Sequence, residues 1–492
     1  MVHLSTTFFT LLITVLSSQL VGTKETATGP SVVNSVTLDG VTYINKGLVA
    51  FGLIPSDFRE STGDTLGGIG SAIALKPNTW TIGGSGQFTG TFIVHPDRGY
   101  NVEETINYQA RHHEIDFTLT PYYDSNKLSF SSAQKTLVLE YKKTVLEFDV
   151  GQKTTSGLDP EGVRMPSQAI NSPFPGPLPV VSATDNRLTL DVEGIIANAD
   201  GSFWISDEYA PGIYRISSTS AVVQALPIPD AIIPRDKDGN LFFTSDDDPE
   251  TGRAGNQGFE GLTIDPTTGR IYAMLQAATI QDGGDDKSTS RYTRLLAFDV
   301  QGNQSTLAGE WVVPLPLSPK DNTETCNEIA FVGNGVFFAL SRDGDGRGGD
   351  DNNSKYKNAD LFSIRNATDI HGTKFDSPAH PIASNGKLDS SITPATYVPF
   401  ISFVDDDQLA RFGLHNGSPD DETLLDAKWE SLTLAPVGDA SFPDDYFLFT
   451  AADNDFLSTH GFSLGEPFDA EIDVDNQFLV FRVTLPGAVL KQ

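Results

Sequence analysis

Short runs of apolar residues, separated by clusters of Gly, Pro, Asn and Asp, recur along most of the chain. Residues 203–205, 271–275 and 446–450 are such runs, and pairs such as Asp200-Gly201 and Asn334-Gly335 stand between them. Spacing typical of an amphipathic helix is scarce. Brief apolar runs bounded by turn residues predict β-hairpins, and therefore an all-β fold.

An internal repeat organises these runs. Each copy begins with an acidic residue, a small residue and an aliphatic strand, followed by a turn, an aromatic strand, an acidic or polar loop and a third strand. The clearest copies begin at Glu193, Glu260, Glu328 and Glu430, and the first three of these are almost equally spaced. A unit of this size fits one four-stranded propeller blade. We predict a six-bladed β-propeller with long loop insertions; seven blades, or two unrelated β-sandwiches, are the alternatives.

Two regions follow the repeat less regularly. Residues 67–75 resemble a degenerate first unit with Ser71 in place of Glu, and the stretch from Ser71 to Glu193 leaves room for a unit that does not align. Long polar insertions occur at residues 246–258, 281–291, 343–356 and 369–391. Loops of this length in a compact fold are usually functional or mobile.

The acidic residues that begin the repeats predict a ring of carboxylates. The innermost strand of each blade lines the central channel, so Glu193, Glu260, Glu328 and Glu430 would face one axis. Crowded carboxylates raise one another's pKa and need compensation, and Ca²⁺ takes 6–8 oxygen ligands. The alternative is structural: each Glu bonds the backbone of a neighbouring blade.

A second polar set follows each aromatic strand. It comprises Asp207-Glu208, Gln276, Arg342-Asp343 and Asp453-Asn454-Asp455. Since the start of one strand and the end of its antiparallel partner lie at the same edge, this set should lie at the same mouth of the channel as the ring. The expected calcium ligands are therefore Glu193, Glu260, Glu328, Glu430 and Asp453. Glu208 or Asp455 would be the general base, and Arg342 would stabilise developing negative charge.

Two loops resemble calcium loops. Residues 343–351 have a density of Asp and Gly that could wrap a cation, and an ordinary loop is the alternative. Residues 236–240 begin like an EF-hand loop, but Leu241 stands where the sharp-turn Gly is required, so we predict a hairpin turn there.

Composition and the N-terminus restrict the class of protein. The formal net charge of −32 argues against a nucleic-acid partner. Residues 1–23 have the apolar run and small residues of a secretory signal peptide, which leaves 24–492 as a single extracellular domain. We expect no membrane span, because no later segment is long and apolar enough. Cys326 is the single cysteine, which excludes an intrachain disulfide. Four glycosylation sequons lie at Asn303, Asn352, Asn366 and Asn416.

The beginnings of the repeats resemble the phytase-like family, often described as having esterase-like activity of phytase. The matching segments are residues 67–71, 192–195 with 204–211, 256–262, and 429–432 with 452–456. They span most of the mature chain. The resemblance implies a secreted β-propeller that hydrolyses phosphoric or carboxylic esters.

Together these observations predict a secreted, Ca²⁺-dependent hydrolase that acts on a small-molecule ester at the channel mouth and functions as a monomer. Few Lys or Arg residues are available to hold a highly charged phytate. Two other functions stay open: a non-catalytic extracellular propeller that binds a ligand, and a lactonase.

Overall fold

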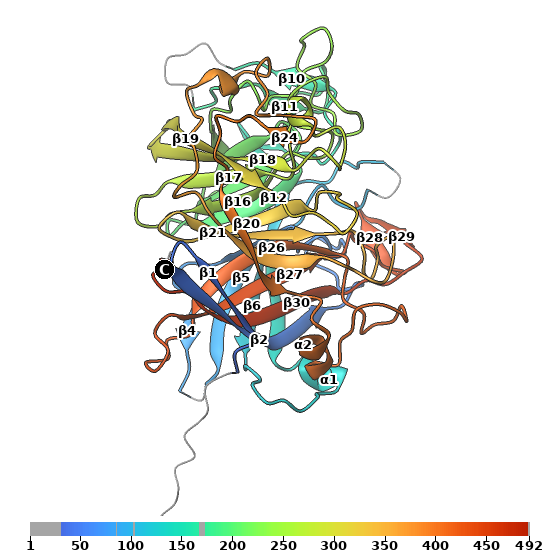
Figure 1. Ribbon diagram of the computed structural model, residues 1–492. Helices are drawn as coiled ribbons and strands as arrows, with labels where there is room; N and C mark the ends of the chain where they lie inside the picture. The colour runs from blue at the N-terminus through green and yellow to red at the C-terminus, as the bar shows by residue number, and fades with distance from the viewer. Residues whose placement is uncertain (1–30, 85, 102–103, 167–172, 491–492) are drawn as a thin grey trace, which may run out of the picture.

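The computed structural model describes residues 31–84, 86–101, 104–166 and 173–490 (Figure 1). In these residues, antiparallel strands form five large sheets that are the blades of a β-propeller. The predicted all-β propeller is thus confirmed. The predicted signal peptide lies outside the described residues.

The blades follow one another along the chain. The first contains β3 (Ala72–Leu75), β4 (Thr81–Ile82), β5 (Phe88–His95), β6 (Arg111–Leu119) and β7 (Leu137–Leu146). The second contains β12 (Val192–Ala197), β13 (Phe203–Asp207), β14 (Gly212–Ile216) and β15 (Val222–Ala225). The third contains β16 (Phe259–Ile264), β17 (Ile271–Leu275), β18 (Tyr292–Gln301) and β19 (Gln304–Pro314). The fourth contains β20 (Thr325–Gly333), β21 (Val336–Arg342), β22 (Lys357–Ser363) and β25 (Thr396–Ser402).

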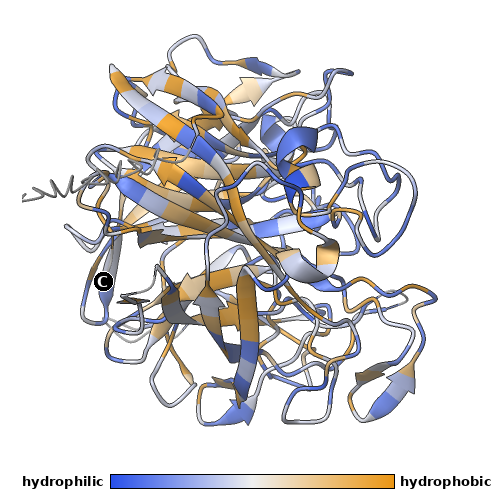
Figure 2. Ribbon diagram, turned by 90° about the horizontal axis from the view of Figure 1, so that it is seen from below, coloured by the Kyte–Doolittle hydropathy of each residue, from blue (hydrophilic) through white to orange (hydrophobic). Residues whose placement is uncertain are grey.

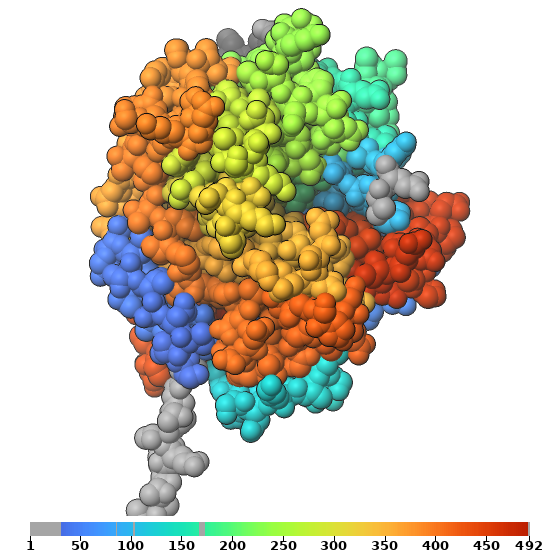
Figure 3. Space-filling model, turned by 45° about the vertical axis from the view of Figure 1, so that its right-hand side comes forward, coloured from blue at the N-terminus to red at the C-terminus, as the bar shows by residue number. Residues whose placement is uncertain are grey.

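Both ends of the described chain build the fifth blade. Its strands, from the outside inward, are β1 (Asn34–Leu38), β2 (Val41–Ile54), β30 (Asn476–Thr484), β27 (Asp445–Asp453) and β26 (Lys428–Pro436). β2 pairs with β30 antiparallel, so an N-terminal hairpin is hydrogen-bonded to C-terminal strands. In Figure 3 the blue N-terminal surface borders the orange surface of the C-terminal part.

Small elements complete the structure. Four two-stranded hairpins are β8 (Phe148–Asp149) with β9 (Lys153–Thr154), β10 (Gly162–Arg164) with β11 (Leu178–Val180), β23 (Ala383–Ser384) with β24 (Lys387–Leu388), and β28 (Gly461–Ser463) with β29 (Glu466–Phe468). The helices are α1 (Phe130–Ala133), α2 (Asp406–Arg411), η1 (Ile280–Asp282) and η2 (Lys374–Asp376). Among the described residues, none of the helices is long and apolar enough to cross a membrane.

The blade count differs from the prediction: the described residues contain five blades, not six. The innermost strands β3, β12, β16, β20 and β26 pack side by side in this order, and β26 returns to β3, so the ring is closed. From the sequence, the stretch after Ser71 has room for an extra repeat unit. Instead, β5, β6 and β7 complete the blade of β3, and the rest forms the short β8–β9 and β10–β11 hairpins.

Local sequence explains why the strands turn where they do. At the β20–β21 hairpin, Asn334 and Gly335 have φ values of 51° and 73°. Both residue types tolerate the left-handed conformation that a tight two-residue hairpin requires. The predicted turn at Asn334-Gly335 is therefore present.

The hydrophobic core lies between neighbouring blades. Figure 2 shows apolar residues concentrated on the strands and polar residues on the loops. Between the fifth and first blades, Phe92 stacks on Phe117 with ring centroids 4.0 Å apart and meets Phe449 edge-on at 5.2 Å. Such packing of large aromatic rings fixes each blade against the next.

The central channel is apolar at one end. Each innermost strand contributes aliphatic residues there, among them Ile73, Ile195, Leu262, Ile329 and Leu432. Val489 and Leu490 of the C-terminal segment line the same end, and the Val489 amide donates a hydrogen bond of 2.8 Å to the Val332 carbonyl. The polar chemistry of the channel is therefore concentrated toward its other end.

Candidate metal centre

A β-bulge lies near the start of four of the innermost strands. The register shifts between Val192 and Gly194 in β12, so Glu193 is the extra residue of that strand. Equivalent shifts make Glu260 the extra residue of β16 and Glu430 that of β26. A bulge re-aims a side chain, and here the same device recurs in successive blades.

In β20 the shift falls between Cys326 and Glu328, so the equivalent residue is Asn327. The apolar end of the channel supports this alignment, because Ile195, Leu262, Ile329 and Leu432 each follow their bulge residue by two positions. The same count in β3 leads from Ile73 back to Ser71, as the sequence predicted. We call Ser71, Glu193, Glu260, Asn327 and Glu430 the ring positions.

Glu328 is not one of the ring positions, although the sequence suggested that it was. Its carboxylate accepts hydrogen bonds from the backbone amides of Leu262, at 2.9 Å, and Ile329, at 2.8 Å. It therefore joins β20 to the neighbouring β16, which is the structural alternative considered for these residues. The units with Glu193, Glu260 and Glu430 have Gly or Ser at this position; a Cβ on Gly261 would lie only 2.9 Å from the Ile329 nitrogen.

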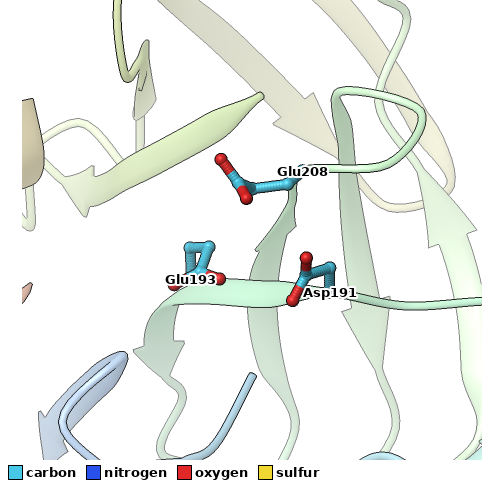
Figure 4. Close-up of side chains that lie close together, drawn as sticks. All are labelled: Asp191, Glu193 and Glu208. Carbon is cyan, nitrogen blue, oxygen red and sulfur yellow. The ribbon is translucent and has the colours of Figure 1, made fainter. Parts of the chain in front are cut away.

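Three buried carboxylates form a cluster at the polar end of the second blade. Asp191, Glu193 and Glu208 each place an oxygen within 4.8 Å of the others (Figure 4). Asp191 directly precedes β12 and Glu208 directly follows β13. The backbone amide of Glu208 donates to the Asp191 carbonyl, at 3.0 Å, which holds the two segments together. This cluster, the acidic triad, could bind a metal ion.

The triad is poorly compensated by the protein itself. Among the described residues, the Glu193 carboxylate has no hydrogen-bond or ion-pair partner, and Asp191 Oδ1 is buried without a hydrogen bond. Burial raises the pKa of Glu193 well above its usual range, and the charges of Glu260 and Asp191 raise it further. Burial, with the charge of Asp191, raises the pKa of Glu208 to about 7. Bringing these acids together has an electrostatic cost that a cation would relieve.

Other acids of the mouth are held by basic side chains. Lys428 lies 2.7 Å from both Asp453 and Asp455. Arg342 forms a short ion pair with Glu430. These two basic side chains partly offset the charge of two expected calcium ligands, Glu430 and Asp453, and of the expected base Asp455.

Asp191 has a basic partner of its own, because Arg98 forms an ion pair of 3.0 Å with its Oδ2. Within the described part of the chain, the triad therefore has one basic side chain in an ion pair for three carboxylates.

Glu260 lies between these two groups. One carboxylate oxygen accepts a hydrogen bond from the Gln276 amide, and the other, Oε2, is buried without a partner. Burial raises the pKa of Glu260 well above its usual range, and the charges of Glu208 and Glu430 add to the effect. The structure thus brings together Glu193, Glu208, Glu260, Glu430 and Arg342, as predicted from the repeat.

The two calcium-like loops take ordinary loop roles. The carboxylate of Asp343 accepts hydrogen bonds from the amides of Lys355 and Tyr356 and forms an ion pair of 3.1 Å with Lys357. Its oxygens are therefore occupied within the loop. Asp236 accepts from the amides of Asp238 and Asn240 at 2.9 and 2.8 Å, which is a turn, as predicted.

Sequence reasoning missed Asp191, Asn327 and Lys428. Asp191 and Lys428 both stand two residues before a ring position, in Asp191-Val192-Glu193 and Lys428-Trp429-Glu430. Aligning the repeats on the hydrophobic residue between them would have included both. The same alignment places Cys326 beside Val192 and Trp429, and therefore Asn327 beside Glu193.

Comparison with known proteins finds a relative similar to most of the chain. A secreted protein of Arthroderma benhamiae, otherwise uncharacterized, is 36% identical over 463 residues, covering 86% of this chain and 89% of the relative. Its extracellular location matches the one predicted for this chain.

Similar solved structures are distant. The aldose sugar dehydrogenase of Streptomyces coelicolor in its PQQ-bound form is 10% identical, covers 89% of this chain and 99% of that chain, and has a TM-score of 0.27. A family AA12 carbohydrate-active enzyme of Trichoderma reesei is 13% identical, covers 92% and 98%, and has a TM-score of 0.29. Similarity at this level carries no argument about chemistry.

The family comparison is more direct. Residues 65–396, more than half of the chain, match the phytase-like family, described as "esterase-like activity of phytase". This segment contains the acidic triad and four of the ring positions. The chain belongs to the phytase-like family.

Proposed function

We propose that this protein is a secreted ester hydrolase that depends on a divalent cation held by Asp191, Glu193 and Glu208. The observation that carries the proposal is the buried triad, in which Glu193 has no partner among the described residues. Membership of a family described by an esterase-like activity supports the reaction class. The sequence pattern of a signal peptide and the secreted Arthroderma relative support export.

Calcium is the cation that best fits the donors. The triad offers carboxylate oxygens alone, without the imidazole or thiolate ligands that favour zinc. Calcium accepts several carboxylates in irregular geometry, whereas magnesium demands near-octahedral order. A bound calcium ion would polarise an ester oxygen and lower the pKa of a bound water.

The neighbouring side chains would perform the remaining steps. Glu260 is suited to be the general base, because its Oε2 is buried and free of hydrogen bonds. Gln276 positions that carboxylate through its amide. Glu208, considered as a base from the sequence, lies with Asp191 and Glu193 and is here a ligand. Arg342, beside Glu430, would face negative charge that develops on the substrate.

The charge of the mouth limits the substrate. The basic side chains Arg98, Arg342 and Lys428 are each in contact with at least one carboxylate. They therefore have little capacity to hold several phosphate groups at once. A small phosphoric or carboxylic ester of low charge fits this mouth better than phytate does.

Hydrolysis of chromogenic phosphate and acetate esters by the purified protein tests the proposal. Assays would include calcium, a chelator and calcium added back after chelation. Turnover should require calcium and be lost in Glu193→Gln, whereas Glu140→Gln, which changes an exposed acid of β7, should behave like wild type.

Three results would redirect the proposal. Absence of chelator-sensitive turnover on both ester classes would contradict it. Hydrolysis of lactones alone would reassign the substrate class. Tight ligand binding without any turnover would favour a non-catalytic propeller.

A further inference from the structure

We propose that Asn327 supplies an amide oxygen to the same cation from the opposite wall of the channel. This inference rests on the proposed function, because it concerns the cation of the acidic triad. Nothing in the triad itself points to Asn327, which belongs to a different blade.

The first support is position. Asn327 is the bulge residue of β20 and is therefore equivalent to Glu193 in β12. β16 lies between these two strands in the ring, yet some residues of β12 and β20 still approach to Cα–Cα distances of 8 Å or less. Side chains that leave equivalent ring positions on two walls so close together can reach a common ion near the axis.

The second support is an unmet hydrogen-bonding requirement. Asn327 is fully buried, and neither its Oδ1 nor its Nδ2 has a hydrogen-bond partner in the described structure. Buried amides without partners are uncommon, because each unsatisfied group carries a desolvation cost. A cation bound to Oδ1 would satisfy the more polar end of this side chain.

The third support is the balance of charge. Three triad carboxylates already exceed the charge of one calcium ion, and Glu260 and Glu430 add to the same field. Calcium takes 6–8 oxygens, and amide carbonyls are common among them. A neutral oxygen at position 327 would add a ligand without a further negative charge, which explains why Asn rather than Glu occupies this ring position.

The test is calcium titration of the full-length secreted protein by calorimetry. Asn327→Leu should weaken calcium binding about tenfold or more, since a ligand is removed while the triad is intact. Asn327→Asp keeps an oxygen at the same place and should bind calcium at least as tightly as wild type. Gln224→Leu is the matched control: Gln224 is also buried with both amide atoms unpartnered, but it lies on β15, the outermost strand of its blade.

The outcomes separate this inference from the proposed function. Wild-type affinity in Asn327→Leu, with binding lost in Glu193→Gln, would overturn the role of Asn327 and leave the triad standing. Loss of binding in Asn327→Asp would also overturn it. If Asn327→Leu does not fold, as judged by its thermal transition, the Asn327→Asp result decides. Absence of calcium binding in wild type would overturn both proposals.

Discussion

Neighbouring charges shift the pKa values of two buried glutamates of this protein in opposite directions. Glu147 is fully buried, but it lies 3.3 Å from His95 and 3.0 Å from His112. Burial alone would raise its pKa, yet the two histidines lower the pKa of Glu147 to about 2. Glu193 is also buried but faces other acids, which raise its pKa further. The first arrangement stabilises the fold, and the second favours a ligand.

Glu147 makes a prediction about acid stability. Its pKa is lower in the folded state than the ordinary value of 4.5. The stabilisation of the fold by the ionised Glu147 carboxylate is therefore complete above about pH 4.5, and it is lost as the pH falls toward about 2. A shift of this size corresponds to about 3 kcal/mol. Denaturant unfolding from about pH 5.5 to pH 2 should show Glu147→Gln less stable by this order at the upper end of the range, where the carboxylate is ionised and the histidines are protonated, with the difference shrinking in stronger acid.

The matched comparison is Glu140→Gln, which changes an acid whose side chain is 75% exposed. It should follow the wild-type curve throughout. Curves of Glu147→Gln and wild type that stay parallel down to pH 2 would show that the histidine contacts do not stabilise the ionised carboxylate.

At the scale of elements, the repeat predicted local structure better than pairing. Strand openings such as residues 192–195 and 259–262 were found because alternation and turn residues are local signals. The place of β5 to β7 beside β3 depends on contacts between blades, and no local signal records it. The pairing of β2 with β30 joins segments more than 400 residues apart, for example Phe51 with Leu479.

In the candidate site too, the sequence predicted the residues that carry a local signal and missed those placed by folding. The repeat led to Glu193, Glu260 and Glu430 because each begins a unit, and acids on equivalent strands converge. The repeat led to Glu328 instead of Asn327 because the alignment matched acidic residues. The bulge of β20 places Asn327, and not the acid beside it, at the equivalent position. Asp191 precedes its strand, and the only signal for it in the sequence is the repeat position that it shares with Lys428.

Glu328 tests whether the fourth blade is tied to the third through its carboxylate. Glu328→Leu would leave two buried amides, Leu262 and Ile329, without an acceptor. Each unsatisfied donor costs about 1–3 kcal/mol, so a marked loss of unfolding free energy is expected. Glu328→Gln keeps a neutral oxygen acceptor and should cost much less. Denaturant unfolding of the two variants measures the difference.

The calcium affinity of the same variant provides a second test of the role of Glu328. Glu328→Gln should retain wild-type calcium affinity, because its side chain bonds backbone amides. A large loss of affinity in this variant, with stability unchanged, would return Glu328 to the set of ligands.

At the scale of the whole molecule, closure of the ring depends on the two ends of the described chain. Asp445 of β27 forms buried ion pairs with Lys46 of β2, at 2.6 Å, and with Arg482 of β30, at 2.7 Å. It also accepts a hydrogen bond from the Thr484 hydroxyl at 2.6 Å. One carboxylate thus connects the N-terminal hairpin with the C-terminal strands of the fifth blade.

Removing the Asp445 carboxylate should weaken the contact between the N-terminal hairpin and the C-terminal strands of the fifth blade. Asp445→Ala would leave Lys46 and Arg482 buried without their main partner, and breaking such a pair costs about 3–5 kcal/mol. The midpoint of denaturant unfolding should fall accordingly, and proteolysis should release the N-terminal hairpin first. Asp444→Asn changes the exposed neighbour and should leave both measurements unchanged. Equal stability of the two variants would show that β-sheet pairing alone closes the ring.

The most direct test of the account is thermal unfolding of the purified protein during a calcium titration, for wild type and Glu193→Gln. A cation bound only by the folded state raises stability by about 2.7 kcal/mol at a hundredfold excess over its dissociation constant. The account predicts that calcium raises the wild-type midpoint in a saturable way and that Glu193→Gln abolishes most of this shift. A wild-type midpoint that ignores calcium, or an equal shift in Glu193→Gln, would contradict a metal centre at the triad.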